Sequence, residues 1–550
     1  MDKKFSLTLT DRKASGFLAM LTLICFLPLV DKAFNIDEPM YIWAARHIRQ
    51  NPLDFYGFMV NWDGISQPMS ELMQNPPLSS YYLALLAGFF GWNESLLHSG
   101  FVVTGMAVIW GTYRLARDMS YTPLQGLFAA LVVFCTPAYF ILANYVTCDM
   151  SMLAAWIWAV ILWRRAMLAD DFRLYLLSSL LISVAALTKY FGIALIPLLL
   201  VYSLAVRRRA GIWVLALLVP AGVLLAYQLI TINLYGKGLL SGAAMYATGL
   251  RIGSGLIPKT LAGFAFVGGG LVSVIFSMLA VTDRRGAISG LVSSVMLLVL
   301  LLIGQDSVLA LYSRSSAGYL IQTAVMATAG AGLMVLAIMS MWRKRDADSL
   351  LLLCWIIGTF VFTCYVNWTI SARNILPMAP AAGLLLAGRI AVDDETGSFK
   401  WSDSWAVVSL VPALLVSILV ARADYHHAGS ARKAAGMMMQ DLSGLQRNIW
   451  FQGHWGFQYY MELLEARPFD IRNSTVGAGD IMIIPGNNSN TAALADELSS
   501  MLRSYSYSSV CCLTTMNAGV GAGFYSDDWG GLPFVFGPAP EESYRVYLLH

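Results

Sequence analysis

Long apolar runs follow one another along most of this 550-residue chain and constrain its fold more than any other feature. A helix needs about 20 apolar residues to cross roughly 30 Å of hydrocarbon. With 57% hydrophobic and only 13% charged residues, these runs exclude a water-soluble globular protein. We predict a polytopic α-helical membrane protein with about thirteen transmembrane helices, near 16–30, 95–115, 122–144, 148–163, 174–190, 191–206, 211–234, 261–281, 287–304, 318–341, 349–367, 375–391 and 404–421.

The Lys and Arg residues between these runs predict the orientation. With the N-terminus in the cytoplasm, the inner segments hold nineteen of the 36 Lys and Arg residues, the outer segments nine and the tail eight. Short cytoplasmic loops collect positive charge, so this distribution favours a cytoplasmic N-terminus, and an odd number of spans then places the tail outside. The first run is expected to stay in the protein, since Pro28, Val30 and Asp31 make a poor signal-peptide cleavage site.

We predict a transmembrane domain over 1–421 and a soluble C-terminal domain over 422–550. In the first outer loop, 35–94, the segment 37–50 places Ile36, Met40, Trp43, Ala44 and Ile48 along one apolar helical face. The segment 79–92 is apolar but too short for an upright span, which is typical of a re-entrant or interfacial helix. In the tail we expect strands near 448–451 and 480–485 and helices near 456–465 and 491–502, as in a small α/β domain.

Carboxylates and amines at the outer ends of spans are candidate functional groups, because such groups are costly to hold near lipid. Asp37 and Glu38 follow the first span, Asp149 opens the span near 148–163, and Lys189 closes the next one. Each also has an ordinary structural explanation. An acidic residue at a helix N-terminus stabilises the helix dipole, and a Lys at the end of a span extends to the lipid headgroups.

The motifs around these residues occur in a recognisable order. They are DEPMY at 37–41, NPPL at 75–78 followed by two tyrosines at 81–82, DM at 149–150, LTK at 187–189 and ARNILP at 372–377. This order resembles the membrane GT-C glycosyltransferases of the protein O-mannosyltransferase and aminoarabinose (lipid A) transferase type. The resemblance is best over about 16–210 and is looser toward the late motif.

The resemblance implies a GT-C fold and an inverting enzyme without a nucleotide-sugar donor. Such an enzyme moves a sugar from a polyprenyl-phosphate carrier to an acceptor on the outer face of the membrane. By the resemblance, Asp37 is the general base and Glu38 belongs to the same catalytic motif. The other implied roles are positioning of a substrate or of Asp37, by Tyr41, Asn75 and Asp149, and binding of the donor phosphate, by Lys189, Arg251 and Arg373.

The sequence departs from these families in two motifs. Gln74-Asn75-Pro76 stands where aminoarabinose transferases have Glu-Lys-Pro, and Asn374 stands where the late motif has Tyr. The first change removes a carboxylate and a cation near the donor, which weakens aminoarabinose as the sugar. No cofactor is firmly implied, and a divalent metal stays open without a clear ligand set, because Glu71, His47 and Asp63 lack a diagnostic spacing.

The partners expected from the sequence are a polyprenyl-phosphate-linked sugar, membrane lipids and a lipid, glycan or protein acceptor. A net charge of +3 without a basic tail argues against nucleic acid. We expect a multi-pass protein of a bacterial inner membrane with a periplasmic tail. A secondary transporter or lipid flippase and an inactive GT-C scaffold remain as alternatives, although transporters usually carry their charges near the bilayer midplane.

Overall fold

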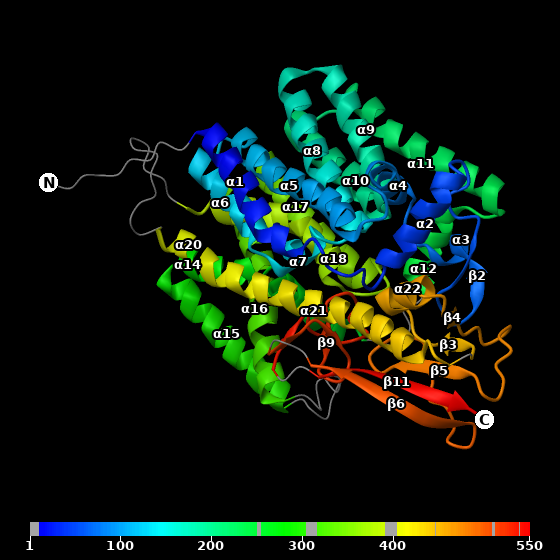
Figure 1. Cartoon of the computed structure of the whole chain (residues 1–550). Helices are drawn as coiled ribbons and strands as arrows, with labels where there is room; N and C mark the ends of the chain where they lie inside the picture. The colour runs from blue at the N-terminus through cyan, green and yellow to red at the C-terminus, as the bar shows by residue number, and fades with distance from the viewer. Residues whose placement is uncertain are drawn as a thin grey trace.

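The computed structural model describes residues 10–249, 255–303, 316–390, 404–445, 447–508, 512–537 and 540–550 (Figure 1). Within these ranges, nine helical segments are long and apolar enough to cross a membrane, or ten if the bent pair α13 (Leu256–Gly270) and α14 (Val272–Val281) forms one span. The nine are built from α1 (Asp11–Phe26), α5 (Glu94–Asp118), α8 (Cys148–Ala169), α10 (Leu195–Arg207), α11 (Trp213–Tyr235), α15 (Arg284–Ile303), α16 (Ala317–Lys344), α17 (Ala347–Val361) and α21 (Leu410–Leu442).

The membrane architecture is confirmed, but the predicted number of thirteen spans is not. Three of the predicted runs form short helices instead, namely α6 (Pro123–Phe134) with α7 (Pro137–Leu142), α9 (Phe172–Thr188), and α18 (Ala372–Ile375) with α19 (Ala379–Ala387). Proline has no N–H to donate within a helix, so helices restart at Pro137 and near Pro377 and Pro380. The pair α13 and α14 bends by 79° directly after Gly268-Gly269-Gly270.

Glycines allow α13 and α16 to pack backbone to backbone. Gly268 of α13 faces the backbone carbonyl of Met326, and Gly330 of α16 faces the carbonyl of Phe264. A Cβ atom at either glycine would collide with backbone, which cannot move aside as a side chain can. Small residues of this kind let membrane helices approach backbone to backbone.

The first outer loop folds as predicted at its two helices, α2 (Glu38–Gln50) and α4 (Leu78–Phe90). Between them lie a two-stranded hairpin, β1 (Met59–Asn61) and β2 (Ser66–Pro68), and the short α3 (Met69–Leu72). Met40 and Ile48 of α2 are buried, as the apolar face required. A further short helix, α12 (Leu239–Gly249), follows α11.

The tail contains a five-stranded mixed sheet in the order β4-β3-β5-β11-β6, with bounds Arg467–Pro468, Ile449–Phe451, Ile481–Pro485, Glu542–Leu549 and Ser499–Tyr507. β3 runs parallel to β4 and β5, whereas β11 runs antiparallel to β5 and β6. Helix α22 (Trp455–Leu463) follows β3. Two small pairs complete the tail, β7 (Leu513–Thr514) with β10 (Val535–Phe536) and β8 (Met516–Asn517) with β9 (Ala522–Gly523).

The tail predictions were right at β3, β5 and α22 and wrong at 491–502. That segment contains no helix: a turn leads into the strand β6, which pairs with β11 along eight residues from Ser499 to Tyr507. Pairing with β11 stabilises the extended conformation of β6, and this cross-strand pairing outweighs the helical pattern of the local sequence.

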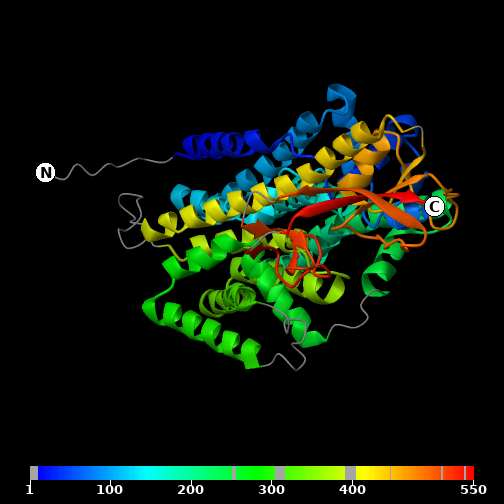
Figure 2. The same ribbon diagram turned by 60° about the horizontal axis from the view of Figure 1, so that its bottom comes forward.

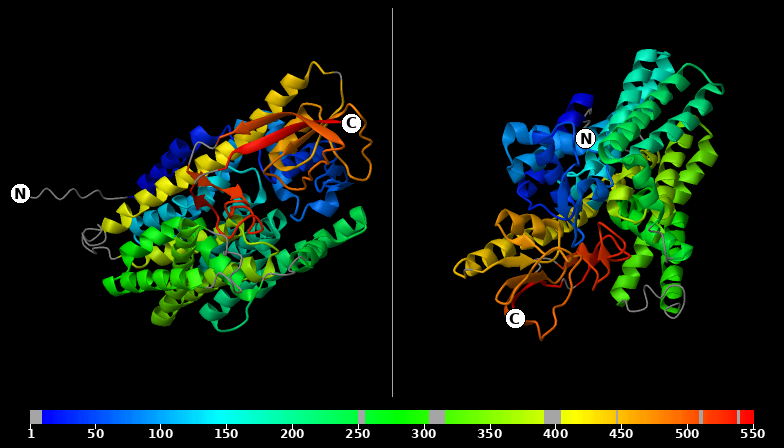
Figure 3. Two further views of the ribbon diagram at one scale, coloured as in Figure 1. Left: turned by 90° about the horizontal axis from the view of Figure 1, so that it is seen from below. Right: turned by 90° about the vertical axis from the view of Figure 1, so that its right-hand side faces the viewer.

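Helix α21 connects the membrane bundle to the tail. Its 33 residues would extend about 50 Å at 1.5 Å per residue, which is longer than the ~30 Å hydrocarbon core. It runs without a break through the predicted domain boundary at 421/422, and that division remains a prediction. Figures 2 and 3 show α21 in yellow leading to the sheet in orange and red, which lies beside the blue outer-loop helices.

Candidate functional site

The acidic pair after the first span opens helix α2. Asp37 directly precedes the helix, and its backbone N–H donates a 3.1 Å hydrogen bond to the hydroxyl of Tyr145. Its carboxylate Oδ2 lies 2.5 Å from Nη1 of Arg373, and the side chains of Asp37 and Arg373 are 29% and 19% exposed. The Asp37 carboxylate is therefore fixed in place and still accessible, as a group must be if it is to take a proton from a substrate.

A second ion pair is built from the neighbouring helices. Asp149, in the first turn of α8, places Oδ1 2.6 Å from Nζ of Lys189, which follows the last residue of α9. The other carboxylate oxygen accepts a 3.1 Å hydrogen bond from the hydroxyl of Thr147. Lys189 Nζ also donates a 2.9 Å hydrogen bond to Oδ1 of Asn374. Arg373 and Asn374 are adjacent in α18, so this short helix joins the two pairs.

The structure thus brings four of the sequence-predicted residues together, and we call Asp37, Asp149, Lys189 and Arg373 the ion-pair cluster. Two carboxylates and two cations leave it formally neutral. Asn374, where the resembled families have Tyr, supplies an amide oxygen to this cluster rather than a hydroxyl.

Glu38 and Tyr41 lie beside the cluster but are buried. The Glu38 side chain is fully buried, and its two oxygens accept hydrogen bonds from the backbone N–H groups of Asn35, at 2.7 Å, and Val146, at 2.8 Å. The Tyr41 hydroxyl donates a 3.0 Å hydrogen bond to Sγ of Cys148. These contacts anchor the start of α2 against the segment that leads into α8, which suits positioning of Asp37 better than direct contact with a substrate.

Burial raises the pKa of Glu38 to about 8, although the nearby Lys32 and the two backbone hydrogen bonds act in the opposite direction. In the unfolded chain this carboxyl ionises near pH 4.5, so raising the pH from 5 to 8 favours unfolding. We expect thermal unfolding midpoints in detergent to fall over this range more steeply for the wild type than for Glu38→Gln. A Glu465→Gln variant, changed at an exposed position, is the control. Equal slopes for the wild type and Glu38→Gln would contradict this role of Glu38.

Two other predicted residues are not placed in the cluster. The backbone carbonyl of Asn75 accepts a 2.9 Å hydrogen bond from the hydroxyl of Tyr56, which fixes the peptide of Asn75 rather than its amide side chain. Arg251 lies outside the described residues. Substrate contacts of both residues remain predictions.

The sequence did not reveal the aromatic support behind Asp37. The Tyr145 hydroxyl donates a 3.1 Å hydrogen bond to the carbonyl of Asn35, and the Tyr145 ring centroid lies 5.3 Å from that of Tyr525 in the tail. The Tyr525 hydroxyl donates a 2.9 Å hydrogen bond to Asp424, whose other oxygen lies 2.5 Å from Nζ of Lys32. The local sequence offered one sign of this support, Lys32 beside the first span. A Lys at such a position is ordinarily explained by contact with lipid headgroups.

In the part of the chain that the structure describes, no group of three or more His, Cys, Asp or Glu side chains is arranged to hold a metal ion.

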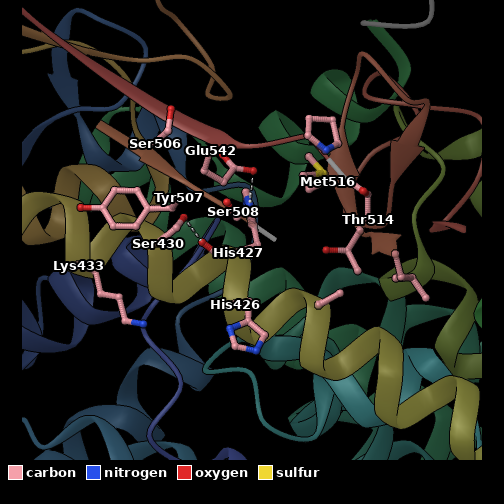
Figure 4. Close-up of a pocket in the computed structure, with 14 residues that line it drawn as sticks. His426, His427, Ser430, Lys433, Ser506, Tyr507, Ser508, Thr514, Met516 and Glu542 are labelled. Carbon is pink, nitrogen blue, oxygen red and sulfur yellow. Dashed lines mark hydrogen bonds and ion pairs between the residues drawn. The ribbon is translucent and has the colours of Figure 1, made fainter. Parts of the chain in front are cut away.

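A cavity of about 290 Å³ lies between α21 and the strands β6 and β11, away from Asp37 (Figure 4). In it, Nδ1 of His427 on α21 lies 3.1 Å from a carboxylate oxygen of Glu542 on β11, and Nδ2 of Asn487 donates a 2.9 Å hydrogen bond to the same oxygen. The contact between His427 and Glu542 joins the long helix to the tail sheet.

The fold is similar to that of the GT-C membrane glycosyltransferases. An oligosaccharyltransferase from Archaeoglobus fulgidus tethered to an acceptor peptide matches with a TM-score of 0.50 and 12% identity, over 84% of this chain and 63% of that one. The chain thus spans less than two thirds of the length of that relative.

A family described as dolichyl-phosphate-mannose-protein mannosyltransferase matches residues 74–235. The resemblance expected from the sequence is thereby confirmed. ArnT from Cupriavidus metallidurans bound to undecaprenyl phosphate matches at 14% identity and TM-score 0.43, over 86% of this chain and 93% of that one. The Pmt1–Pmt2 complex of S. cerevisiae bound to its sugar donor matches at 16% identity and TM-score 0.33, over 44% and 36%. A comparison with curated proteins gives no match.

Proposed function

We propose that this protein is an inverting glycosyltransferase that moves a sugar from a polyprenyl-phosphate carrier to an acceptor at the outer face of a bacterial inner membrane. The observation that carries the proposal is the accessible Asp37 carboxylate paired at 2.5 Å with Arg373, beside the pair of Asp149 and Lys189. This arrangement offers a base for the acceptor and cations for a phosphate leaving group within one cluster.

In the proposed reaction, Asp37 takes the proton from an acceptor hydroxyl as the acceptor oxygen attacks the anomeric carbon of the donor sugar. The bond between that carbon and the carrier phosphate oxygen breaks, and the phosphate leaves with the electron pair. A single displacement inverts the anomeric carbon.

The cations of the cluster can meet the charge of the leaving phosphate. A guanidinium has five N–H donors, and the contact with Asp37 occupies Nη1 of Arg373, whereas Lys189 uses two of its three donors for Asp149 and Asn374. Counted over the described residues, each cation therefore retains donors for phosphate. Charge-assisted hydrogen bonds to phosphate are among the strongest in proteins.

The identity of the donor is supported by the family match. The matched segment, 74–235, contains Asp149 and Lys189, and the family is described by a dolichyl-phosphate-linked mannose donor. The excess of Lys and Arg in the predicted inner loops supports transfer at the outer face, with the tail in the periplasm.

Loss of the guanidinium in Arg373→Gln is expected to lower turnover about 10²- to 10³-fold, because one charged donor to the developing phosphate is removed. The assay uses the full chain in lipid nanodiscs with radiolabelled sugar-phosphate polyprenols and follows release of the free carrier phosphate. Arg472→Gln, at an exposed position of the tail, is the matched control and should retain wild-type turnover.

Two outcomes would overturn the proposal. If the wild type binds a carrier but releases no carrier phosphate with any sugar tested, the protein is a transporter or a scaffold. If Arg373→Gln turns over at the wild-type rate, the ion-pair cluster is not the reaction centre.

A further inference from the structure

A second cavity, of about 490 Å³, opens between α2, the β1–β2 hairpin and the tail. Its lining includes Trp43, Arg46 and His47 from α2, Asn61 from β1, and Glu462 and Asp470 from the tail. This volume is in the range of small-molecule sites, which combine apolar surface with a few placed polar groups. Asp37 does not line the cavity, although it directly precedes the same helix.

Hydrogen bonds between the outer loop and the tail hold the walls of this cavity. Nε2 of Gln458 donates to the backbone carbonyl of Asn61 at 2.6 Å and to the carboxylate of Glu462 at 2.7 Å. The Asn61 side chain donates a 3.0 Å hydrogen bond to the carbonyl of Phe469, and Asp470 accepts one of 3.0 Å from the backbone of Ser66. The cavity is thus formed before any ligand arrives, which lowers the cost of binding.

Two buried side-chain atoms in this wall, Nε2 of His47 and Oδ1 of Asn61, have no hydrogen-bond partner within the described residues. Asn61 is only 8% exposed, and its Oδ1 makes no hydrogen bond within the described residues, although its Nδ2 is bonded. A buried acceptor without a partner costs free energy, and most such atoms in proteins are satisfied. Because Oδ1 is itself buried, a hydroxyl of a ligand would reach it only after the Asn61 side chain turns toward the cavity.

The charges of the cavity select the kind of ligand. The cavity is lined by two carboxylates, those of Glu462 and Asp470, and one guanidinium, that of Arg46. The Asp470 carboxylate already accepts four hydrogen bonds, from the backbones of Ser66, Arg472 and Asn473 and from the Asn473 amide. Arg46 donates a 3.1 Å hydrogen bond to Tyr459 and lies 5.1 Å from the ring centroid of Trp92. Two carboxylates against one guanidinium disfavour a phosphate or other anion. The Glu462 carboxylate accepts one hydrogen bond within the described residues, from Gln458, and so has room for the hydroxyl of a neutral ligand.

Trp43 supplies the apolar part of the cavity. Its ring is partly exposed and packs edge-to-face against Trp62, with ring centroids 6.0 Å apart. An aromatic face beside hydrogen-bond acceptors matches a sugar ring, which has C–H groups on its faces and hydroxyls around its edge. Trp43 is six residues after Asp37, a rise of about 9 Å along the helix.

We infer that this cavity binds a neutral carbohydrate, and that this carbohydrate is part of the acceptor, so that the acceptor is itself glycosylated. The statement that the carbohydrate is part of the acceptor rests on the proposed transferase function, whereas the binding of a carbohydrate in the cavity does not. The cavity would hold one sugar of the acceptor while another group of the same molecule reaches Asp37.

The binding test uses the fluorescently labelled full chain in nanodiscs on an array of neutral oligosaccharides of mannose, glucose, galactose, rhamnose and N-acetylglucosamine. We expect the wild type to bind a subset of these glycans, and Asn61→Ala and Glu462→Gln each to weaken that binding at least 10-fold. Glu465→Gln, an exposed change near Glu462 that does not line the cavity, should bind as the wild type does. Equal thermal unfolding midpoints would show that the cavity variants are folded.

The outcomes separate this inference from the proposed function. Binding to none of the neutral glycans, or binding that both cavity variants retain, would overturn the carbohydrate site even if the donor is turned over. If glycans bind in the cavity but no carrier phosphate is released in the nanodisc assay, the carbohydrate site stands and the transferase proposal fails. If glycans bind in the cavity and carrier phosphate is also released, the cavity variants should raise KM for the bound glycan as acceptor. They should leave hydrolysis of the donor by water unchanged.

Discussion

Replacing Asp37 with asparagine is expected to reduce sugar transfer about 10²- to 10⁴-fold, the range that a positioned general base contributes. Asparagine preserves the size of the side chain and can still accept a hydrogen bond from Arg373, but it cannot take a proton from the acceptor hydroxyl. The fold should survive, because the Asp37 side chain is 29% exposed and its backbone contact with Tyr145 is independent of the carboxylate. Single-turnover transfer in nanodiscs measures the effect.

The matched control is Asp63→Asn, the same chemical change on the same outer loop. Asp63 is exposed and accepts a 2.9 Å hydrogen bond from Gln67, away from the ion-pair cluster. This variant should transfer sugar at the wild-type rate. Activity of Asp37→Asn within threefold of the wild type would remove Asp37 from the mechanism, and a matching loss in Asp63→Asn would indicate a general disturbance of the loop.

Replacing Lys32 with methionine is expected to destabilise the protein by about 3–5 kcal/mol, because it leaves the carboxylate of Asp424 buried without its cation. The two side chains are 4% and 1% exposed and their charged atoms lie 2.5 Å apart. Asp424 also accepts the hydroxyl of Tyr525, whose ring packs against Tyr145 behind Asp37. The thermal unfolding midpoint in nanodiscs should therefore fall by many degrees, and sugar transfer should fall with it.

A second change distinguishes the unpaired charge from a simple packing defect. In Lys32→Met with Asp424→Asn, the buried charge is absent, and the amide oxygen can still accept the hydrogen bond from Tyr525. Most of the lost stability should return. If the double variant is no more stable than Lys32→Met alone, loss of packing by the lysine side chain accounts for the effect, and the ion pair contributes little.

Part of the fold followed directly from local patterns in the sequence. Apolar runs predicted the helices that became α5, α8, α10, α11 and α16, because a helix in lipid satisfies its own backbone hydrogen bonds. The same reasoning failed where prolines or glycines interrupt a run, as at Pro137 and after Gly270, since length and hydropathy do not register a bend. It also failed at β6, where the partner strand β11 decides the conformation.

The candidate site shows the same division. The sequence by itself determined which residues are candidates for the chemistry, because Asp37, Asp149 and Lys189 lie at ends of apolar runs where charge is costly. Only the tertiary structure decided that Arg373 pairs with Asp37 across 336 positions of the chain, and that Asn61 and Glu462 share a cavity. The physical reason is that hydropathy and periodicity are properties of neighbouring residues, whereas ion pairs and cavities depend on how distant segments pack.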